Sequence, residues 1–151
     1  MYIEQTLEEK YIEERIEILK ELSKIYGEDV YDIAAEVKSR LEKERVFAKY
    51  NDELPIDLEL YSQYAFNDFE NISQHISNEI LEQTDNRLVV KVNECSYCKI
   101  YSRYKGNKIG KKLVCNMDSV ITRALNPSFT LKRTKRQMDG DDYCVFIIEK
   151  L

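Results

Sequence analysis

The sequence lacks any run that approaches the ~20 consecutive apolar residues of a membrane-spanning helix. Its first residues, Met1 to Gln5, show no basic start followed by an apolar stretch, so they do not resemble a secretory signal. Internal repeats and low-complexity segments are also missing, and histidine occurs once. We therefore expect a cytoplasmic protein. Because thiols stay reduced in that compartment, a disulfide framework is not the expected role of the four cysteines.

The size and composition indicate one domain with one core, since the chain has 151 residues of which 43% are hydrophobic. We expect a single domain over residues 1–151, with a helical part at 1–78 and a mixed part at 79–151. The 28 acidic residues slightly outnumber the 23 Lys and Arg, and the first sixty residues are rich in Glu. Basic residues gather at 99–112 and 132–136. This division argues against a nucleic-acid partner and leaves room for an anionic small ligand.

The N-terminal half is predicted to be helical. Thr6 and Glu9 form a capping box for a first helix, which Gly27 ends. A second helix begins near Asp29, and we expect the two to form an antiparallel hairpin. The expected apolar face of the second helix consists of Val30, Ile33, Ala34, Val37, Leu41 and Ala48. Pro55 opens a third helical stretch to about Ser77, whose aromatics either pack or line a pocket: Tyr61, Tyr64, Phe66 and Phe69.

The second half predicts strands and helices. Residues 80–84 and 88–94 flank a turn at Asp85-Asn86 and form a β-hairpin. Helices are expected at 95–104 and 108–125, and a second hairpin pairs 129–135 with 143–149. In the last strand, odd- and even-numbered positions are both apolar, which indicates that other elements cover the strand on both faces of the sheet. The predicted fold class is α+β, a small antiparallel sheet of about four strands in two hairpins, packed with helices.

The predicted helix 108–125 carries Cys115 and Asp118 away from its apolar stripe. At ~100° per residue these two residues share a face with Lys111 and Thr122. The opposite, core-facing stripe is Ile109, Leu113, Met117, Val120, Ile121 and Ala124. Because free cysteine is among the most buried residue types, we expect the second face to border a pocket. The alternative is that Cys115 is a small core residue and Asp118 a solvated surface charge.

The remaining cysteines allow several roles. Cys95 lies where a strand gives way to a helix, and a helix N-terminus lowers the pKa of a thiol. Cys98 completes a C-x-x-C, but a thioredoxin-like site needs a βαβ context, and these strands are predicted antiparallel. Zinc is the stronger alternative, with four thiolates, or three plus Asp118, although the spacing differs from that of a zinc ribbon. Any of the four, including Cys144, can also fill a core gap, which is the simplest role of Cys98.

Two further residues are candidates. Gly140-Asp141 predicts a hairpin turn, which also brings the Asp141 carboxylate to the sheet end near Cys144. The single histidine, His75, is either a structural helix residue or an acid–base group that titrates near neutral pH.

Several motifs of the last third resemble the L-2-amino-thiazoline-4-carboxylic acid hydrolase family of bacterial proteins. The likeness covers residues 80–149 well and the helical half more loosely. Its most specific parts are the L-x-C-x-x-D helix and the closing G-D-x-x-C-x-F. The residues that carry it are Cys95, Leu113 to Asp118, Asn126-Pro127, Leu131 to Thr134 and Gly140 to Phe146. The G-D-x-x-C ending also resembles the tail of 4-vinyl-reductase-type sensor domains, whose cysteines can hold zinc.

The first resemblance implies hydrolysis of a cyclic amidine, a reaction on non-peptide C–N bonds. Water adds at C2 of 2-amino-thiazoline-4-carboxylate, and the ring opens toward N-carbamoyl-cysteine. Cys115 would be nucleophile or metal ligand, and Asp118 would pair with the amidinium and move protons. The full catalytic set is Cys115, Asp118, Cys95, Cys144 and His75; the substrate-binding set is Lys111, Arg133 and Asp141.

The second resemblance implies an alternative function, a non-catalytic small-molecule-binding or sensor module with a structural zinc–thiolate site. Zinc, if bound, would be held by Cys95, Cys115 and Cys144; no cofactor is otherwise expected. The expected partner is a small molecule, with no nucleic acid and no membrane, and self-association into a homo-oligomer is left open.

Overall fold

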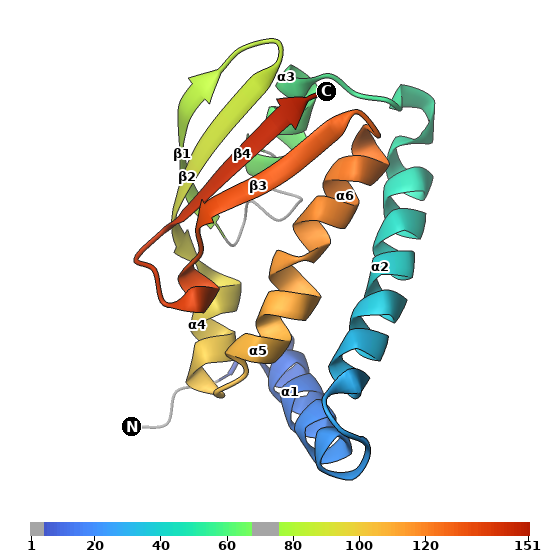
Figure 1. The fold of residues 1–151 in the computed structure, drawn as a ribbon, viewed down its shortest axis with the longest axis vertical. Coiled ribbons are helices and arrows are strands. Elements are labelled where there is room, and N and C mark those ends of the chain that lie inside the picture. The colour runs from blue at the N-terminus through green and yellow to red at the C-terminus, as the bar shows by residue number, and fades with distance from the viewer. Residues whose placement is uncertain (1–4, 68–75) are drawn as a thin grey trace.

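A twisted antiparallel sheet lies against a layer of helices (Figure 1) in the computed structural model, which describes residues 5–67 and 76–151. Its strands are β1 (Ile76–Gln83), β2 (Arg87–Cys95), β3 (Phe129–Lys135) and β4 (Cys144–Lys150), in the order β1-β2-β4-β3. β1 pairs with β2 and β3 with β4, so both predicted hairpins are confirmed. The central pairing of β2 with β4 joins them into one sheet. The predicted α+β class is confirmed.

The N-terminal helical hairpin is also confirmed. Helix α1 (Leu7–Tyr26) begins at Thr6, whose side chain accepts the Glu9 amide, and ends at Gly27 with a φ of 84°. Glycine adopts this positive φ more readily than other residues, which explains why the helix ends at Gly27. Helix α2 (Asp29–Tyr50) comes directly after this turn and lies alongside α6 (Met117–Leu125) (Figure 1).

Val30 and Ala34 of the predicted apolar face of α2 are half-buried against the core, but the rest of that face is wrong. Ile33, Val37 and Leu41 are exposed, whereas Tyr31 and Val46 are buried. The difference arises because α2 packs on α6 along the side that carries Val46. Two surface ion pairs lie near the start of α2: Glu28 with Lys108 and Asp32 with Lys112. The face of α2 that points inward therefore carries many charged residues. The charged inner face includes Lys38, Glu42, Arg45 and Lys49, the first two of which are half-buried.

The third helical stretch is shorter than predicted. Helix α3 (Leu58–Ser62) begins after Asp57, which accepts the Leu60 amide, and passes into a π-helical turn, η2 (Gln63–Asn67). The predicted helix to about Ser77 is wrong at its end, because β1 already begins at Ile76. Tyr61 and Phe66 are buried in the core, which agrees with the prediction that these aromatic residues pack. Phe69 and His75 lie outside the described residues.

The predicted helices at 95–104 and 108–125 are present, but the second is not regular. Helix α4 (Ser96–Arg103) is followed by α5 (Asn107–Gly110), a π-helical turn η4 (Lys111–Cys115), and α6. A π turn inserts one residue into the helical repeat and rotates the rest of the helix by ~100°. The most buried residues are accordingly Ile109, Leu113 and Met117, and then Thr122 and Leu125. The predicted Ile121 and Ala124 are half-buried and also pack on the core.

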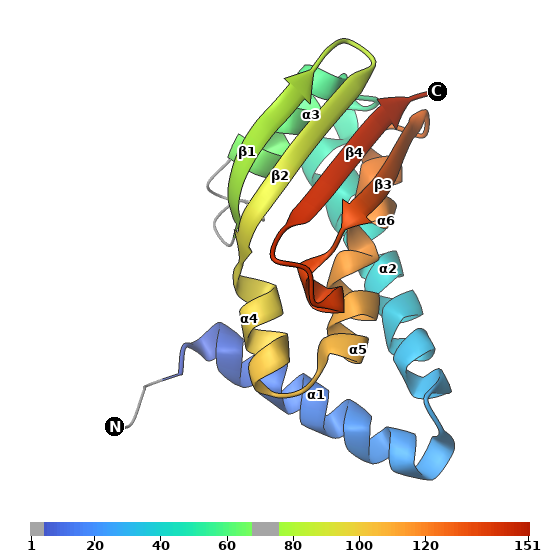
Figure 2. The same cartoon turned by 60° about the vertical axis from the view of Figure 1, so that its left-hand side comes forward.

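The helices of the described residues lie on one face of the sheet (Figure 2). Along β4, the side chains of Cys144, Phe146 and Ile148 are buried, whereas Val145 and Ile147 are only half-buried. The prediction that β4 is covered on both faces is therefore wrong. Among the described residues, no helix is both long enough and apolar enough to cross a membrane.

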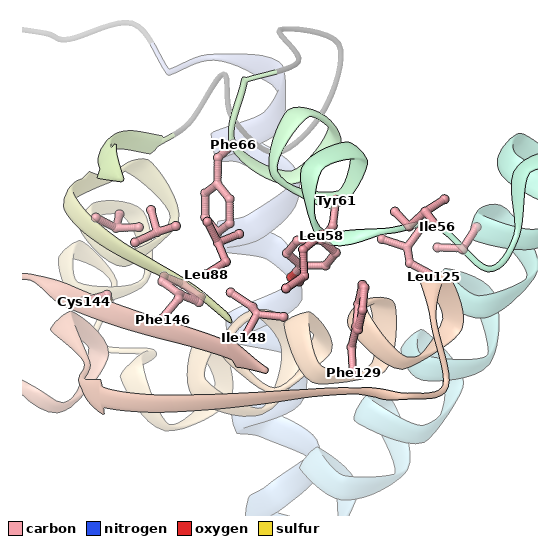
Figure 3. Packing of buried hydrophobic residues seen from close by; sticks show 13 residues of the cluster. Ile56, Leu58, Tyr61, Phe66, Leu88, Leu125, Phe129, Cys144, Phe146 and Ile148 are labelled. Atoms are coloured by element: carbon pink, nitrogen blue, oxygen red, sulfur yellow. The ribbon is translucent and has the colours of Figure 1, made fainter. Parts of the chain in front are cut away.

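The buried side chains form two clusters. The first lies between the sheet and the α3–η2 segment, α6 and the end of α2 (Figure 3). The second lies where α1 and the start of α2 pack on α4 and α5, around Ile16 and Tyr101. Gly110 lets α5 pack closely on α4, because a Cβ there would lie 2.7 Å from the Tyr101 ring. The π turn connects the two clusters.

Candidate functional site

A cavity of about 250 Å³ opens within the first cluster, between α2, the α3–η2 segment, α6 and β4. Figure 3 shows Tyr61 and Phe66 projecting toward the sheet, near Phe146 on β4. The Phe66 ring meets the Phe146 ring edge to face, with centroids 5.8 Å apart. Most lining residues are apolar or aromatic: Val46, Tyr50, Tyr61, Tyr64, Ala65, Phe66, Ile121, Leu125 and Phe146. The charged lining residues are Glu42, Arg45, Lys49 and Asp118.

Asp118 is held at the cavity by a buried ion pair. Arg133, on β3, donates from Nη2 to Oδ2 of Asp118, on α6. The side chain of Arg133 is 5% exposed and that of Asp118 is 25% exposed. Arg133 lies opposite Phe146 in the sheet, with its Cζ 4.3 Å from the centre of that ring. The guanidinium is therefore fixed between the aromatic ring and the carboxylate, behind the carboxylate as seen from the cavity.

The surroundings of Asp118 shift its pKa. Burial raises the pKa of this carboxyl, although the positive charges of Arg133, Lys38 and Arg136 act in the opposite direction. Lys38 reaches this region from α2, and its Nζ donates to the carbonyl of Leu113 in the π turn. Burial lowers the pKa of Lys38. A half-buried carboxylate with a raised pKa at the edge of an apolar cavity is a candidate proton carrier.

Hydrogen bonds also fix the backbone of Asp118. Thr122 is fully buried and donates from its hydroxyl to the Asp118 carbonyl at 2.6 Å. The Thr122 oxygen lies 2.8 Å from the Tyr61 hydroxyl, which therefore acts as the donor to it. Burial raises the pKa of Tyr61, so its hydroxyl keeps the proton that this hydrogen bond needs. Thr122 thus connects α3 to the turn of α6 that carries the carboxylate.

The three predicted site cysteines are poorly disposed to act as thiolates. Burial raises the pKa of Cys115 to about 12, with Arg133 opposing and Asp118 adding to the shift. Burial raises the pKa of Cys95 to about 11, although the backbone at Cys98 acts to lower it. The predicted lowering at the helix N-terminus is therefore wrong, because burial outweighs it. Burial also raises the pKa of Cys144, whose sulfur accepts the Gln137 amide at 3.2 Å. Among the described residues that line the cavity, none is a cysteine.

The raised pKa values predict slow thiol modification. At pH 8 a thiol with a pKa of about 12 holds roughly 10³-fold less thiolate than one with a pKa of 9. We expect iodoacetamide to label Cys95 and Cys115 at least ~10-fold more slowly in the folded protein than in the urea-unfolded protein. Peptide mass spectrometry after timed quenching measures each site. Rapid labelling of Cys115 in the folded protein would contradict this and favour a nucleophilic cysteine.

The predicted carboxylate-binding residues have other partners. Lys111 pairs with Asp139 at 2.7 Å, and neither lines the cavity. Arg133 is near the cavity but is paired with Asp118. Asp141 accepts the Arg136 amide at 2.8 Å in the turn between β3 and β4, so the turn interpretation of Gly140-Asp141 is confirmed. His75 lies outside the described residues.

The cations of α2 were missed by sequence reasoning. Arg45 and Lys49 line the cavity, and the positive charge of Lys38 acts on Asp118. The sequence does contain a signal for them, since Lys38, Glu42, Arg45 and Lys49 recur at helical spacing with the buried Tyr31 and Val46. The prediction instead placed the apolar residues of the opposite face of α2 in the core.

The predicted zinc ligands do not gather at one point. Within residues 5–67 and 76–151, no three His, Cys, Asp or Glu side chains are grouped so that they could hold a metal. Cys115 packs on the second cluster, whereas Cys95 and Cys144 belong to the first. The zinc site of Cys95, Cys115 and Cys144 stays a prediction.

Comparison with known proteins adds one match. The model of the L-2-amino-thiazoline-4-carboxylic acid hydrolase family matches residues 2–148, almost the whole chain. No curated protein matches the sequence.

Proposed function

We propose that this chain, which belongs to the L-2-amino-thiazoline-4-carboxylic acid hydrolase family, opens the ring of a cyclic amidine of the 2-amino-thiazoline type. The cavity beside Asp118 would be the site of this reaction, in a cytoplasmic protein. One observation carries the proposal: a half-buried carboxylate, held by Arg133, faces a cavity with mostly apolar walls. Such a site suits a small ring with a polar amidine edge.

The reaction adds one water and breaks one bond. The water oxygen forms a bond to C2 and its proton passes to a base. The C2–S bond then breaks, the sulfur leaves as a thiolate and takes up a proton, and the product is N-carbamoyl-cysteine. Both nitrogens stay bonded to C2, which becomes the urea carbon. The broken bond is therefore carbon–sulfur, and the expected C–N hydrolysis does not fit this product.

Asp118 is the proposed base. Its carboxylate would pair with the amidinium edge of the substrate, take the proton of the attacking water and return a proton to the leaving sulfur. Burial raises the pKa of this carboxyl, which brings it closer to the working pH and makes both transfers easier. Arg133 would orient the carboxylate from behind. We favour activated water over Cys115 as the nucleophile, because burial raises the pKa of that thiol.

The substrate carboxylate would be bound by the cations of α2. Arg45 and Lys49 both line the cavity. The Arg45 side chain is 65% exposed and pairs with Glu42 at 3.1 Å, so it can turn toward a ligand at little cost. Lys49 lies over the Tyr50 ring, with its Nζ 5.2 Å from the ring centre. These residues replace Lys111 and Arg133 as our candidates for this role.

A direct assay tests the proposed reaction. We expect the purified protein to convert 2-amino-thiazoline-4-carboxylate into N-carbamoyl-cysteine, measured as new free thiol and by mass spectrometry. A parallel incubation with chelator tests the zinc prediction, since zinc dependence would return Cys95, Cys115 and Cys144 to the site. Binding of the thiazoline without any conversion would overturn the proposal and support a non-catalytic sensor module.

A further inference from the structure

The cavity beside Asp118 is more apolar than a bare aminothiazoline carboxylate requires. Of the thirteen described residues that line it, nine are apolar or aromatic. They include two ring pairs, Tyr50 stacked on Tyr64 at 4.7 Å and Phe66 against Phe146 at 5.8 Å. Aromatic walls of this kind favour a flat apolar group, which can stack on one ring and meet the edge of another.

The cavity is also larger than that substrate needs. Its volume of about 250 Å³ approaches the roughly 300–1,000 Å³ of pockets that bind drug-sized ligands. A single thiazoline ring with one amino and one carboxylate group is well below that size. The remaining space would have to hold water against aromatic side chains, which is unfavourable compared with an apolar group in the same place.

The charges in the cavity suggest where that extra group lies on the ligand. Arg133 pairs with Asp118 and also lies over Phe146, so the carboxylate and the Phe66–Phe146 pair are at the same end of the cavity. Arg45 and Lys49 line the α2 side. A ligand that pairs its amidine with Asp118 and its carboxylate with α2 brings the exocyclic nitrogen of the amidine next to the aromatic rings.

We propose that the preferred substrate is a 2-amino-thiazoline-type carboxylate whose exocyclic nitrogen carries an apolar, ring-sized substituent. This inference rests on the proposed function for the reaction, but the preference for an apolar group can be measured by binding alone. Phe66, Phe146 and Ala65 would contact the substituent. Ala65, in the η2 turn, is the smallest lining residue and leaves the room that a ring occupies.

Two pairs of compounds test the preference in the complete chain. The substrates are 2-amino- and 2-anilino-thiazoline-4-carboxylate, and the products are N-carbamoyl- and N-phenylcarbamoyl-cysteine. We expect the phenyl compounds to show at least ~10-fold higher kcat/KM and at least ~10-fold lower Kd by calorimetry, the range for an apolar group that fills an apolar pocket. Equal or weaker binding of the phenyl product would overturn the inference.

A second experiment fills the cavity with a larger side chain. Ala65→Phe, or Ala65→Leu if the larger side chain prevents folding, should remove the advantage of the phenyl product over N-carbamoyl-cysteine. Ala48→Phe is the matched control, because Ala48 is exposed on α2 and does not line the cavity. An advantage that persists in both Ala65 variants would also overturn the inference.

The two proposals fail in different ways. If the phenyl product binds more tightly but neither thiazoline is opened, the proposed reaction is wrong and the ligand preference stands. If both thiazolines are opened but the unsubstituted one is the better substrate and its product binds as tightly, the reaction stands and the preference is wrong.

Discussion

Asp118→Asn is expected to lower kcat for thiazoline opening by roughly 10²–10⁴-fold, the usual contribution of a general base. Asparagine keeps the size of the side chain and can still accept a hydrogen bond from Arg133, but it cannot take a proton from water. It also cannot pair with an amidinium as a charge. Steady-state kinetics on 2-amino-thiazoline-4-carboxylate measure the loss. A wild-type rate would remove Asp118 from the mechanism.

Two controls separate chemistry from folding in this experiment. Asp118→Asn leaves the charge of Arg133 buried without its partner, so the variant should also lose stability. The double variant Asp118→Asn with Arg133→Met removes both charges; it should recover much of that stability and none of the activity. Asp139→Asn is the matched surface change, since Asp139 pairs with Lys111 away from the cavity. It should leave kcat unchanged.

Arg133→Met is expected to lower the free energy of unfolding at pH 7 by about 3–5 kcal/mol, the cost of leaving one member of a buried ion pair without its partner. The guanidinium is 5% exposed, so solvent cannot replace it beside Asp118. Its contact with the Phe146 ring is lost as well. Urea denaturation of variant and wild type measures the difference. Lys111→Met, which breaks an exposed pair, should cost less than about 1 kcal/mol.

The stability loss in Arg133→Met should depend on pH. Burial raises the pKa of Asp118 above its ordinary value of 3.8, and removing a positive charge raises it further. The folded state then holds the proton more tightly than the unfolded state, so stability falls as pH rises from 3.8 through the folded pKa. The deficit relative to wild type should accordingly be smaller at pH 5 than at pH 7. A deficit that grows on acidification would contradict a buried, unpaired Asp118.

Local signals in the sequence were sufficient for most of the fold. The cap at Thr6, the stop at Gly27 and the turns between paired strands each depend on a few neighbouring residues, and these are confirmed. The Glu9 carboxylate pairs with Arg103 instead of closing the capping box. The face of α2 depends instead on which other helix it meets. It packs on α6, a helix far along the sequence, through the side that carries Val46, and this leaves Ile33 and Val37 exposed.

The candidate site was predicted in part. Asp118 and Arg133 were both predicted site residues, but with separate roles. Their ion pair was not predicted, because it depends on how α6 crosses the sheet. Cys95 and Cys115 were expected to be reactive from their places on helices, whereas their pKa values are governed by burial, which the sequence does not display. The α2 cations were missed along with the inner face of that helix.

The π-helical turn at Lys111–Cys115 makes the position of Asp118 depend on the number of residues in a helix. Loss of any one residue of this turn would restore an unbroken α-helix and rotate α6 by ~100° relative to α5. Asp118 would then point away from the cavity and from Arg133, although the chain would still contain every residue that lines the cavity. Deletion of a single residue in this turn would thus be enough to remove the site without changing any residue that lines it.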